Sequence, residues 1–367
     1  MLKILDRYLA IAMLRSFLLT GSAVAVLVTL VTTLNDYGLV VRAGEGIGAA
    51  FSLAALAVPR EMLQILPMVV DLAAIALFLA LSRHGETIAT EAGGLSPLRG
   101  LAGPAAAMLV AGFAVLLLLD PIAAASSRAR ENLIARYKGA SASVFQVGPG
   151  GIWLREGSAI GPRVIHARAA SADGRTLRAV SIFAFDRENR LVRRIEARRA
   201  RLLPGRWVVE QGTSWLVSAR DAAATAVTFE RIELSSELAP EVVTRGLDDP
   251  ATVSLWRMPE MLARLEAAGL STTRLELQLH KRLALPLLTI AVLLAAAAFT
   301  MQPTRFGHAG LRILMALVSG FFLFFLDVFA RILGENGQIP PPLAAWAPAL
   351  GGLLLTSGFI LWLEDRR

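Results

Sequence analysis

The side chains that most often carry catalysis or hold a metal are few and scattered along this chain. Its four histidines, His84, His166, His280 and His308, are far apart in the sequence, and no two share a helix face. The sequence contains no H-E-x-x-H pair and no G-x-S-x-G elbow. Because cysteine is absent, thiolate catalysis, thiolate metal sites and disulfides are excluded. We therefore expect no catalytic residue, no metal site and no cofactor.

Nucleotide hydrolysis is excluded on similar grounds. A phosphate-binding loop needs a lysine that follows a glycine and precedes Ser or Thr, because that lysine and the loop amides hold the phosphates together. The three lysines of the chain are Lys3, Lys138 and Lys281, and none follows a glycine. The sequence therefore predicts that this chain does not hydrolyse ATP itself.

Three carboxylates, Asp71, Asp120 and Asp327, lie inside or at the borders of strongly apolar stretches. A membrane protease needs its catalytic groups at matched depth, and no intramembrane carboxylate or histidine aligns with Asp71. A carboxylate inside a membrane span costs about 2.5–3.5 kcal/mol unless it faces protein or water. Two interpretations of Asp71 therefore stay open: packing against a neighbouring helix, and participation in a proton relay.

The elements that position these residues are predicted to be membrane helices. Six stretches supply the ~20 apolar residues that a helix needs to cross a bilayer. They cover residues 11–34, 62–82, 101–124, 283–300, 313–333 and 343–363. The first is expected to be a retained span, because it is too long for a signal-peptide core and lacks a small-residue cleavage site. We expect units at 1–125, 126–270 and 271–367, with a cytoplasmic helix at about 83–96.

Composition and charge agree with a membrane protein. Hydrophobic residues make up 55% of the chain, and the mean hydropathy is +0.57, which is too apolar for a soluble protein of this length. The formal charge of +8 is not interpreted as nucleic-acid binding. Two arginine pairs, at 193–194 and 198–199, fall in the polar segment. They indicate either a solvated strand face or a surface for an acidic partner or lipid head group.

Short-loop charges predict the orientation, because cytoplasmic loops carry the excess of Lys and Arg. One side of the membrane collects Lys3, Arg7, Arg15, Arg83, Arg99, Arg305, Arg312, Arg366 and Arg367. The short loops of the other side hold only Arg42, Arg60 and Arg331. We therefore expect both termini in the cytoplasm and the inserted segment on the outer side.

The inserted segment is predicted to be all β. Short alternating or apolar runs occur at 143–147, 151–154, 164–167, 177–185, 191–197, 207–210, 214–217 and 226–234. Turn signals separate them, for example Pro204–Gly205. This pattern favours a sandwich, a jelly roll or a partly open barrel, followed by an amphipathic helix at 258–268.

Several motifs occur in order along the chain. They are Leu-Asp-Arg-Tyr at 5–8, Val-Pro-Arg at 58–60 with Leu-Pro at 66–67, the 86–96 loop, Gly-Ile-Trp-Leu at 151–154 and the proline-rich 339–348 segment. Together they resemble the LptF/LptG permeases of the lipopolysaccharide exporter. Trp-Arg-Met-Pro at 256–259 is more similar to the LptG half. The resemblance implies a membrane α-helical bundle of six transmembrane helices with an inserted periplasmic all-β jelly-roll domain, in a bacterial inner membrane.

The resemblance also implies the partners. They are a sister permease (LptF-like) that completes a heterodimer, a cytoplasmic ATPase dimer (LptB-like) and a bitopic periplasmic partner (LptC-like). The substrate is lipopolysaccharide, which is extracted from the outer leaflet of the inner membrane and passed to a periplasmic bridge. No nucleic acid is involved.

Site residues follow from the same resemblance. Arg60 matches a basic position that reaches the lipid phosphates, while Asn35 and Asp36 stand where lysines are frequent, so that Arg42 is the nearest substitute. Arg60 is equally compatible with an interfacial anchor. Glu86 matches the acid of the coupling helix that faces the ATPase, and Glu91 and Gly94 belong to the same loop.

Phenylalanines of the fifth apolar stretch, including Phe321 and Phe325, suit either the lining of an apolar path or contact with helices and lipid.

Two other functions compete with lipopolysaccharide export. A mechanotransmission ABC subunit would have four spans with the domain after the first, and a membrane-embedded lipid-modifying enzyme would need His, Asp or Ser gathered at one depth.

Overall fold

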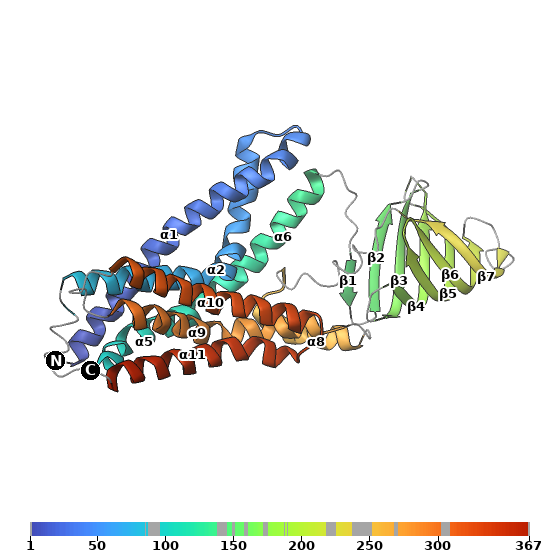
Figure 1. Cartoon of the computed structure of the whole chain (residues 1–367). Coiled ribbons are helices and arrows are strands. Elements are labelled where there is room, and N and C mark those ends of the chain that lie inside the picture. Colours follow the sequence, from blue (N-terminus) through green and yellow to red (C-terminus); the bar gives the residue numbers. More distant parts are fainter. Residues whose placement is uncertain are drawn as a thin grey trace. The chain divides into compact units, whose positions relative to one another are not determined.

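In chain order, the computed structural model has a first group of helices, a β-sheet and a second group of helices (Figure 1). It describes residues 2–84, 86, 96–137, 145–148, 151–157, 161–171, 175–186, 188, 190–217, 225–236, 252–267, 271–301 and 309–365. Within these residues, six helices are long and apolar enough to cross a membrane. The prediction of six membrane helices flanking an inserted β domain is thereby confirmed.

Two compact units make up the chain. One contains residues 1–130 together with 276–367, and the other contains residues 131–275. The helices that are long and apolar enough to cross a membrane are α1 (Leu2–Arg42), α2 (Ile47–Arg83), α5 (Ala102–Ala114) continuing into α6 (Asp120–Tyr137), α9 (Thr273–Thr300), α10 (Ala309–Glu335) and α11 (Pro341–Asp365). Shorter helices are α4 (Pro97–Gly100) and α8 (Met258–Ala267). The start of α1 and the end of α11 lie at the same end of the bundle (Figure 1).

Helix α1 is longer than the sequence predicted. The first span was predicted over residues 11–34, but the helix continues to Arg42. It ends where Gly44, with φ of 81°, adopts the left-handed conformation that commonly follows a helix C-terminus. The polar residues at 35–36 therefore did not end this helix. It ends just before Gly44, whose left-handed backbone cannot continue it.

Prolines shape two of the spans. Helix α2 contains Pro59 and Pro67, each of which removes one backbone hydrogen bond and favours a bend. Between α5 and α6 the chain forms one turn of π-helix, η1 (Val115–Leu119), just before Pro121. A π turn next to a proline accommodates the missing N–H without breaking the span.

Small residues bring the helices close together. A Cβ on Gly103 of α5 would lie 2.3 Å from the carbonyl oxygen of Asp6 on α1, and one on Gly112 would lie 3.0 Å from Pro286 of α9. The latter contact joins the first three spans to the last three. Such glycines let helix backbones approach in a membrane, where packing replaces the hydrophobic effect as the driving force.

The inserted segment forms one antiparallel sheet. The described strands pair in chain order and are β1 (Phe145–Gly148), β2 (Gly151–Gly157), β3 (Pro162–Ala170), β4 (Thr176–Phe185), β5 (Leu191–Leu203), β6 (Arg206–Leu216) and β7 (Val227–Ser235). The two strands predicted at 207–210 and 214–217 are in fact the single strand β6. Gly212 does not interrupt β6, because it pairs with Phe229 of β7.

A line across the sheet interrupts the regular pairing. In four successive strand pairs one residue on each strand is left out of the ladder at the same level, while the register is the same on either side. The skipped residues form a row, which we call the crease: Arg168, Ala179, Arg198, Gln211 and Glu230.

The alternation of buried and exposed side chains restarts at the crease. On β5 the neighbours Arg198 and Arg199 are both exposed, whereas Ala197 and Ala200 on either side are buried. A strict period of two would have turned one half of the strand inside out. The extra residue at the crease therefore keeps one face of the sheet buried along the whole strand.

A buried polar network then joins strands that are not neighbours in the sheet. Glu156 of β2 binds Arg163 of β3 (Oε1 to Nη1, 2.8 Å) and accepts hydrogen bonds from Trp207 Nε1 of β6 at 3.3 Å and Ser236 Oγ, beyond β7, at 2.8 Å. The sheet is therefore folded over, so that its early and late strands meet.

The predicted all-β insertion is confirmed. Its described strands follow one another in chain order around one folded sheet. This folded sheet encloses a hydrophobic core in which Ile165, Ile182 and Trp207 are almost fully buried.

We predict that Glu156→Ala lowers the stability of the β domain by about 3–5 kcal/mol, because it leaves Arg163 buried without its carboxylate. The measurement is the thermal unfolding midpoint of the purified full chain, read from the β domain by limited proteolysis. Glu188→Ala is the matched control, because Glu188 is exposed in a turn. Equal protease resistance of the Glu156 variant and the control would contradict the prediction.

Candidate functional site

Neighbouring cations on α9 bind carboxylates on two different helices. Lys281 Nζ lies 2.7 Å from Asp327 Oδ2 of α10, and Arg282 Nη1 lies 2.5 Å from Asp120 Oδ1 at the start of α6. The Asp120 side chain is fully buried and that of Arg282 is 10% exposed. Successive residues on a helix point about 100° apart, so α9 is held from two directions.

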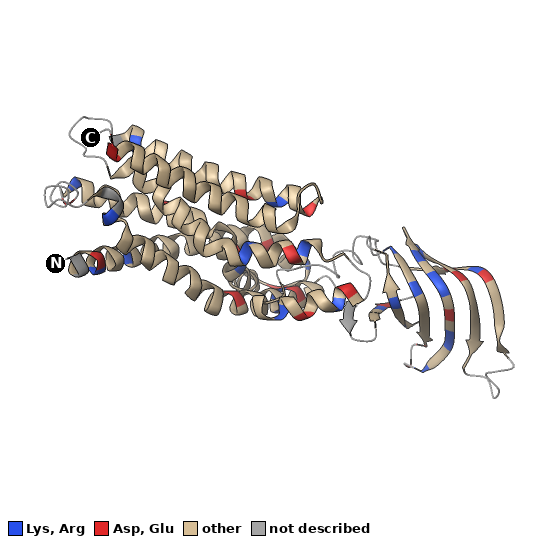
Figure 2. Ribbon diagram, turned by 90° about the horizontal axis from the view of Figure 1, so that it is seen from below, with Lys and Arg blue, Asp and Glu red and all other residues tan. Residues whose placement is uncertain are grey.

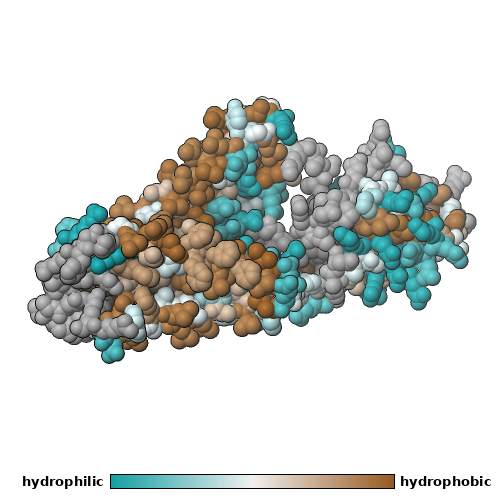
Figure 3. All heavy atoms as spheres, in the orientation of Figure 1, coloured by the Kyte–Doolittle hydropathy of each residue, from teal (hydrophilic) through white to brown (hydrophobic). Residues whose placement is uncertain are grey.

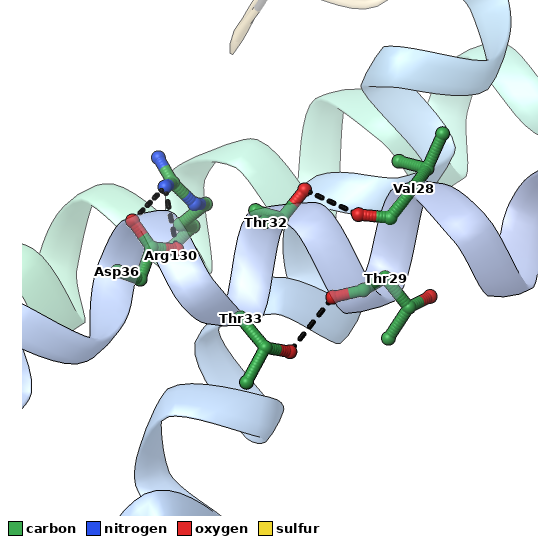
Figure 4. A network of polar contacts seen from close by, with 6 residues as sticks. All are labelled: Val28, Thr29, Thr32, Thr33, Asp36 and Arg130. Carbon is green, nitrogen blue, oxygen red and sulfur yellow. Dashed lines mark hydrogen bonds and ion pairs between the residues drawn. The ribbon is translucent and has the colours of Figure 1, made fainter.

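A third ion pair joins α6 to α1 (Figure 4). Arg130 Nη2 donates to both carboxylate oxygens of Asp36, at 2.8 and 2.9 Å. Before Asp36 in the same helix, the hydroxyls of Thr29, Thr32 and Thr33 donate to backbone carbonyls four residues earlier, each at 2.7 Å. Figure 4 shows the bonds of Thr32 and Thr33. These internal bonds satisfy the hydroxyls without a partner helix, as lipid exposure requires.

Asp71 of α2 lies against α10. A Cβ added to Gly320 would lie 2.2 Å from the Asp71 carboxyl carbon, so only glycine fits there. Asp71 is 3% exposed, and its Oδ1 has no hydrogen-bond partner within the part of the chain that is described. This close approach favours the helix-packing interpretation of Asp71 over the proton relay.

The basic residues predicted to meet lipid phosphates lie on the first two helices. Arg60 is half-buried on α2, one residue after Pro59, and Arg42 is exposed in the last turn of α1. The α1 and α2 helices pack along one another. Their shared role in phosphate binding stays a prediction.

The predicted coupling residue Glu86 lies close to the N-terminal part of α1. Tyr8 Oη donates a hydrogen bond to Glu86 Oε1 at 3.3 Å. Nearby in the chain, Arg99 of α4 pairs with Asp6 of α1, Nη2 to Oδ2, at 3.3 Å. Glu91 and Gly94, the other coupling residues predicted from the sequence, lie outside the described residues.

Phenylalanines form an exposed stripe on α10. Phe321, Phe325 and Phe329 follow at intervals of four and are 55%, 56% and 49% exposed, which places them on one face. The rings of Phe325 and Phe329 stack with centroids 6.3 Å apart. Brown, apolar surface covers much of the helical bundle in Figure 3, so the stripe faces lipid or an apolar partner.

Sequence reasoning missed Arg130 and the interhelical pairs. Arg130 brings a cation beside Asp36, the residue that stands where a lysine was expected on the first span. The sequence offered one usable signal: isolated cations next to apolar stretches, such as Lys281 and Arg282, need carboxylate partners. The partners themselves were hidden by sequence separations of 46 residues for Lys281 and 94 residues for Arg130.

The arrangement of charges defines a class of protein. Across the described ranges, no group of three or more His, Cys, Asp or Glu side chains could hold a metal ion. Three ion pairs instead tie helices to one another. Membrane-length helices with a separate β domain and charges used for interhelical pairing are typical of a multi-pass membrane protein.

Comparison with known proteins gives the family. Residues 7–363 match the family described as "Lipopolysaccharide export system permease LptF/LptG". The chain therefore belongs to the LptF/LptG family. It is 21% identical to the lipopolysaccharide export system permease protein LptG of Haemophilus influenzae, covering 100% of this chain and 99% of the relative. It is 23% identical to LptG of Escherichia coli K12, with coverage of 99% and 98%.

We predict that Arg282→Met destabilises the helical unit by about 3–5 kcal/mol, because Asp120 is then left as a buried, uncompensated charge. The thermal unfolding midpoint of the purified protein in detergent measures this loss. Arg274→Met is the control, because Arg274 is exposed in the first turn of the same helix. The double variant Asp120→Asn/Arg282→Met should recover part of the loss, and an Arg282→Met midpoint equal to that of the control would contradict the prediction.

Proposed function

We propose that this chain is the LptG-like permease subunit that extracts lipopolysaccharide from the outer leaflet of the inner membrane and passes it to a periplasmic bridge. The supporting observation is the family match, which extends from the first span to the last. The six-span bundle with its inserted β domain suits this role. It also argues against the mechanotransmission alternative, which would have four spans.

The energy for extraction comes from a partner in this proposal. The sequence has no phosphate-binding loop, so a cytoplasmic ATPase dimer (LptB-like) supplies the ATP hydrolysis. A sister permease (LptF-like) completes the membrane part, and a bitopic partner (LptC-like) continues the periplasmic path. The excess of Lys and Arg in the short loops supports cytoplasmic termini and a periplasmic β domain.

Extraction of a lipid from the membrane requires an apolar path for its acyl chains. Moving acyl chains into water costs about 0.8 kcal/mol for each exposed CH₂ group, so a lipid with several chains would face a barrier on the order of tens of kcal/mol. The exposed stripe of Phe321, Phe325 and Phe329 offers a surface that offsets this cost. In this proposal the stripe contacts the acyl chains, and Arg60 and Arg42 contact the phosphates.

The direct test reconstitutes the chain with its sister permease and ATPase in proteoliposomes that contain lipopolysaccharide. ATP-dependent transfer of lipopolysaccharide to an added periplasmic acceptor is the expected result. Complete assembly without any ATP-dependent transfer would overturn the proposed function.

We predict that Glu86→Arg uncouples ATP hydrolysis from lipid release by about tenfold or more, because it reverses the charge that faces the ATPase. Membrane insertion should be unchanged, since Glu86 lies beyond the end of α2. Lipid released per ATP hydrolysed is the measurement, and Glu364→Arg at the cytoplasmic end of α11 is the control for charge reversal. Normal export by the Glu86 variant would refute the coupling role.

We predict that Arg60→Glu weakens lipid loading by about tenfold, because it replaces attraction to the phosphates with repulsion. Photocrosslinking of lipopolysaccharide to a probe placed on α2 measures the loading. Arg331→Glu on α10 is a control with the same charge change on a partly exposed arginine. Crosslinking of the Arg60 variant at the wild-type level would count against the phosphate contact and favour the anchor interpretation.

A further inference from the structure

The crease of the β-sheet carries a groove on its solvent-exposed face. Its volume is about 1010 Å³, at the upper end of the range found for small-molecule sites. Six charged side chains line it: Arg178, Arg198, Arg199, Arg231, Glu210 and Glu230. Ala179 and Gln211 complete the lining, and Figure 2 shows the bands of Lys and Arg that cross these strands.

Positive charge in this groove is incompletely balanced. Arg199 has a carboxylate partner in Glu210, at 4.0 Å, and Arg231 has one in Glu233, at 3.2 Å. Arg178 and Arg198 have no ion-pair partner in the portion of the chain that the structure describes. Unpaired guanidinium groups on adjacent strands repel each other, and an anion bound between them would relieve that repulsion.

The backbone under the groove is strained. Ala179 and Gln211 have φ values of 50° and 53°, and within the described ranges no other residue except glycine has a positive φ. Both belong to the crease, and both line the groove. Non-glycine residues in this conformation persist where the surrounding structure enforces it, and such positions concentrate at ligand sites.

The chemistry of the lining limits what can bind. Guanidinium groups donate paired hydrogen bonds to phosphate or carboxylate oxygens, while the Glu and Gln side chains accept from hydroxyls. Ala179 is the one apolar side chain among the lining residues, so acyl chains have nothing to contact. The crease crosses β3 to β7 in the interior of the sheet, where β4 to β6 have no free edge that a peptide strand could pair with.

We propose that this groove binds the phosphorylated saccharide portion of the transported glycolipid. The inference rests on the proposed export function and adds a site that is separate from the membrane residues discussed above. Arg178 and Arg198 bind the anionic groups, and Glu210, Gln211 and Glu230 bind sugar hydroxyls. The β domain thus holds the polar part of the lipid on its outer face.

The test measures binding of a water-soluble probe to the full chain in nanodiscs. The probe is deacylated, phosphorylated lipopolysaccharide oligosaccharide, compared with the same oligosaccharide after phosphatase treatment and with inorganic phosphate. We expect phosphorylated oligosaccharide to bind and rising salt to weaken the binding. Removing its phosphates, or making the variant Arg178→Gln/Arg198→Gln, should reduce affinity at least tenfold.

The control is Arg155→Gln/Arg193→Gln, which removes the same charge from exposed arginines of the same sheet outside the groove. Equal affinity of the groove variant and this control would overturn the inference. Inorganic phosphate that bound as tightly as the oligosaccharide would also overturn it, because the groove would then be a site for a free anion. So would a groove variant that bound the oligosaccharide normally but lost a partner subunit, which would identify a protein-docking surface.

The proteoliposome assay separates this inference from the proposed function. Transfer of lipopolysaccharide by wild-type protein without oligosaccharide binding to the groove would remove the inference and leave the export function intact. Absence of transfer by a complete wild-type assembly would remove the export function itself.

Discussion

The bundle depends on one constraint: hydrocarbon does not solvate charge, so a charge that enters the spans is costly unless it faces protein or water. Lys281 and Arg282 satisfy this requirement through Asp327 and Asp120, and Arg130 does so through Asp36. Because each pair joins two helices, the same interactions that neutralise charge also determine which helices are neighbours. Glycines allow close approach elsewhere in the bundle, where Gly112 lies against Pro286 and Gly320 lies against Asp71.

The sequence predicted the number and approximate location of the spans because membrane helices have a minimum apolar length. It did not predict where α1 ends, since Asn35 and Asp36 resemble a loop until Arg130 is known to cover Asp36. Ion-pair partners were also hidden, because hydropathy describes single segments and says nothing about which segments touch. The candidate site was predicted residue by residue from a family resemblance, and its functional roles remain for experiment.

In the β domain the strands were predictable and the crease was not. Alternation and turn residues marked most strands, but Ala179 and Gln211 are ordinary residue types with no preference for a left-handed backbone. The adjacent exposed arginines Arg198 and Arg199 break the period of two, but Arg193 and Arg194 on the same strand are also adjacent and exposed where the pairing is regular. Adjacent arginines therefore did not identify the crease. The closure of the sheet through Glu156 depends on strands far apart in the chain, so local patterns could not reveal it.

The neighbouring cations of α9 have a mechanical consequence. Since Lys281 and Arg282 are anchored to α10 and α6 on different sides, torsion of α9 about its own axis would stretch both anchors together. Swivelling is thereby resisted, whereas tilting or flexing at Pro286, one turn further along, leaves both anchors in place. A movement at the far end of α9 is therefore expected to tilt or bend the helix and not to rotate it about its own axis.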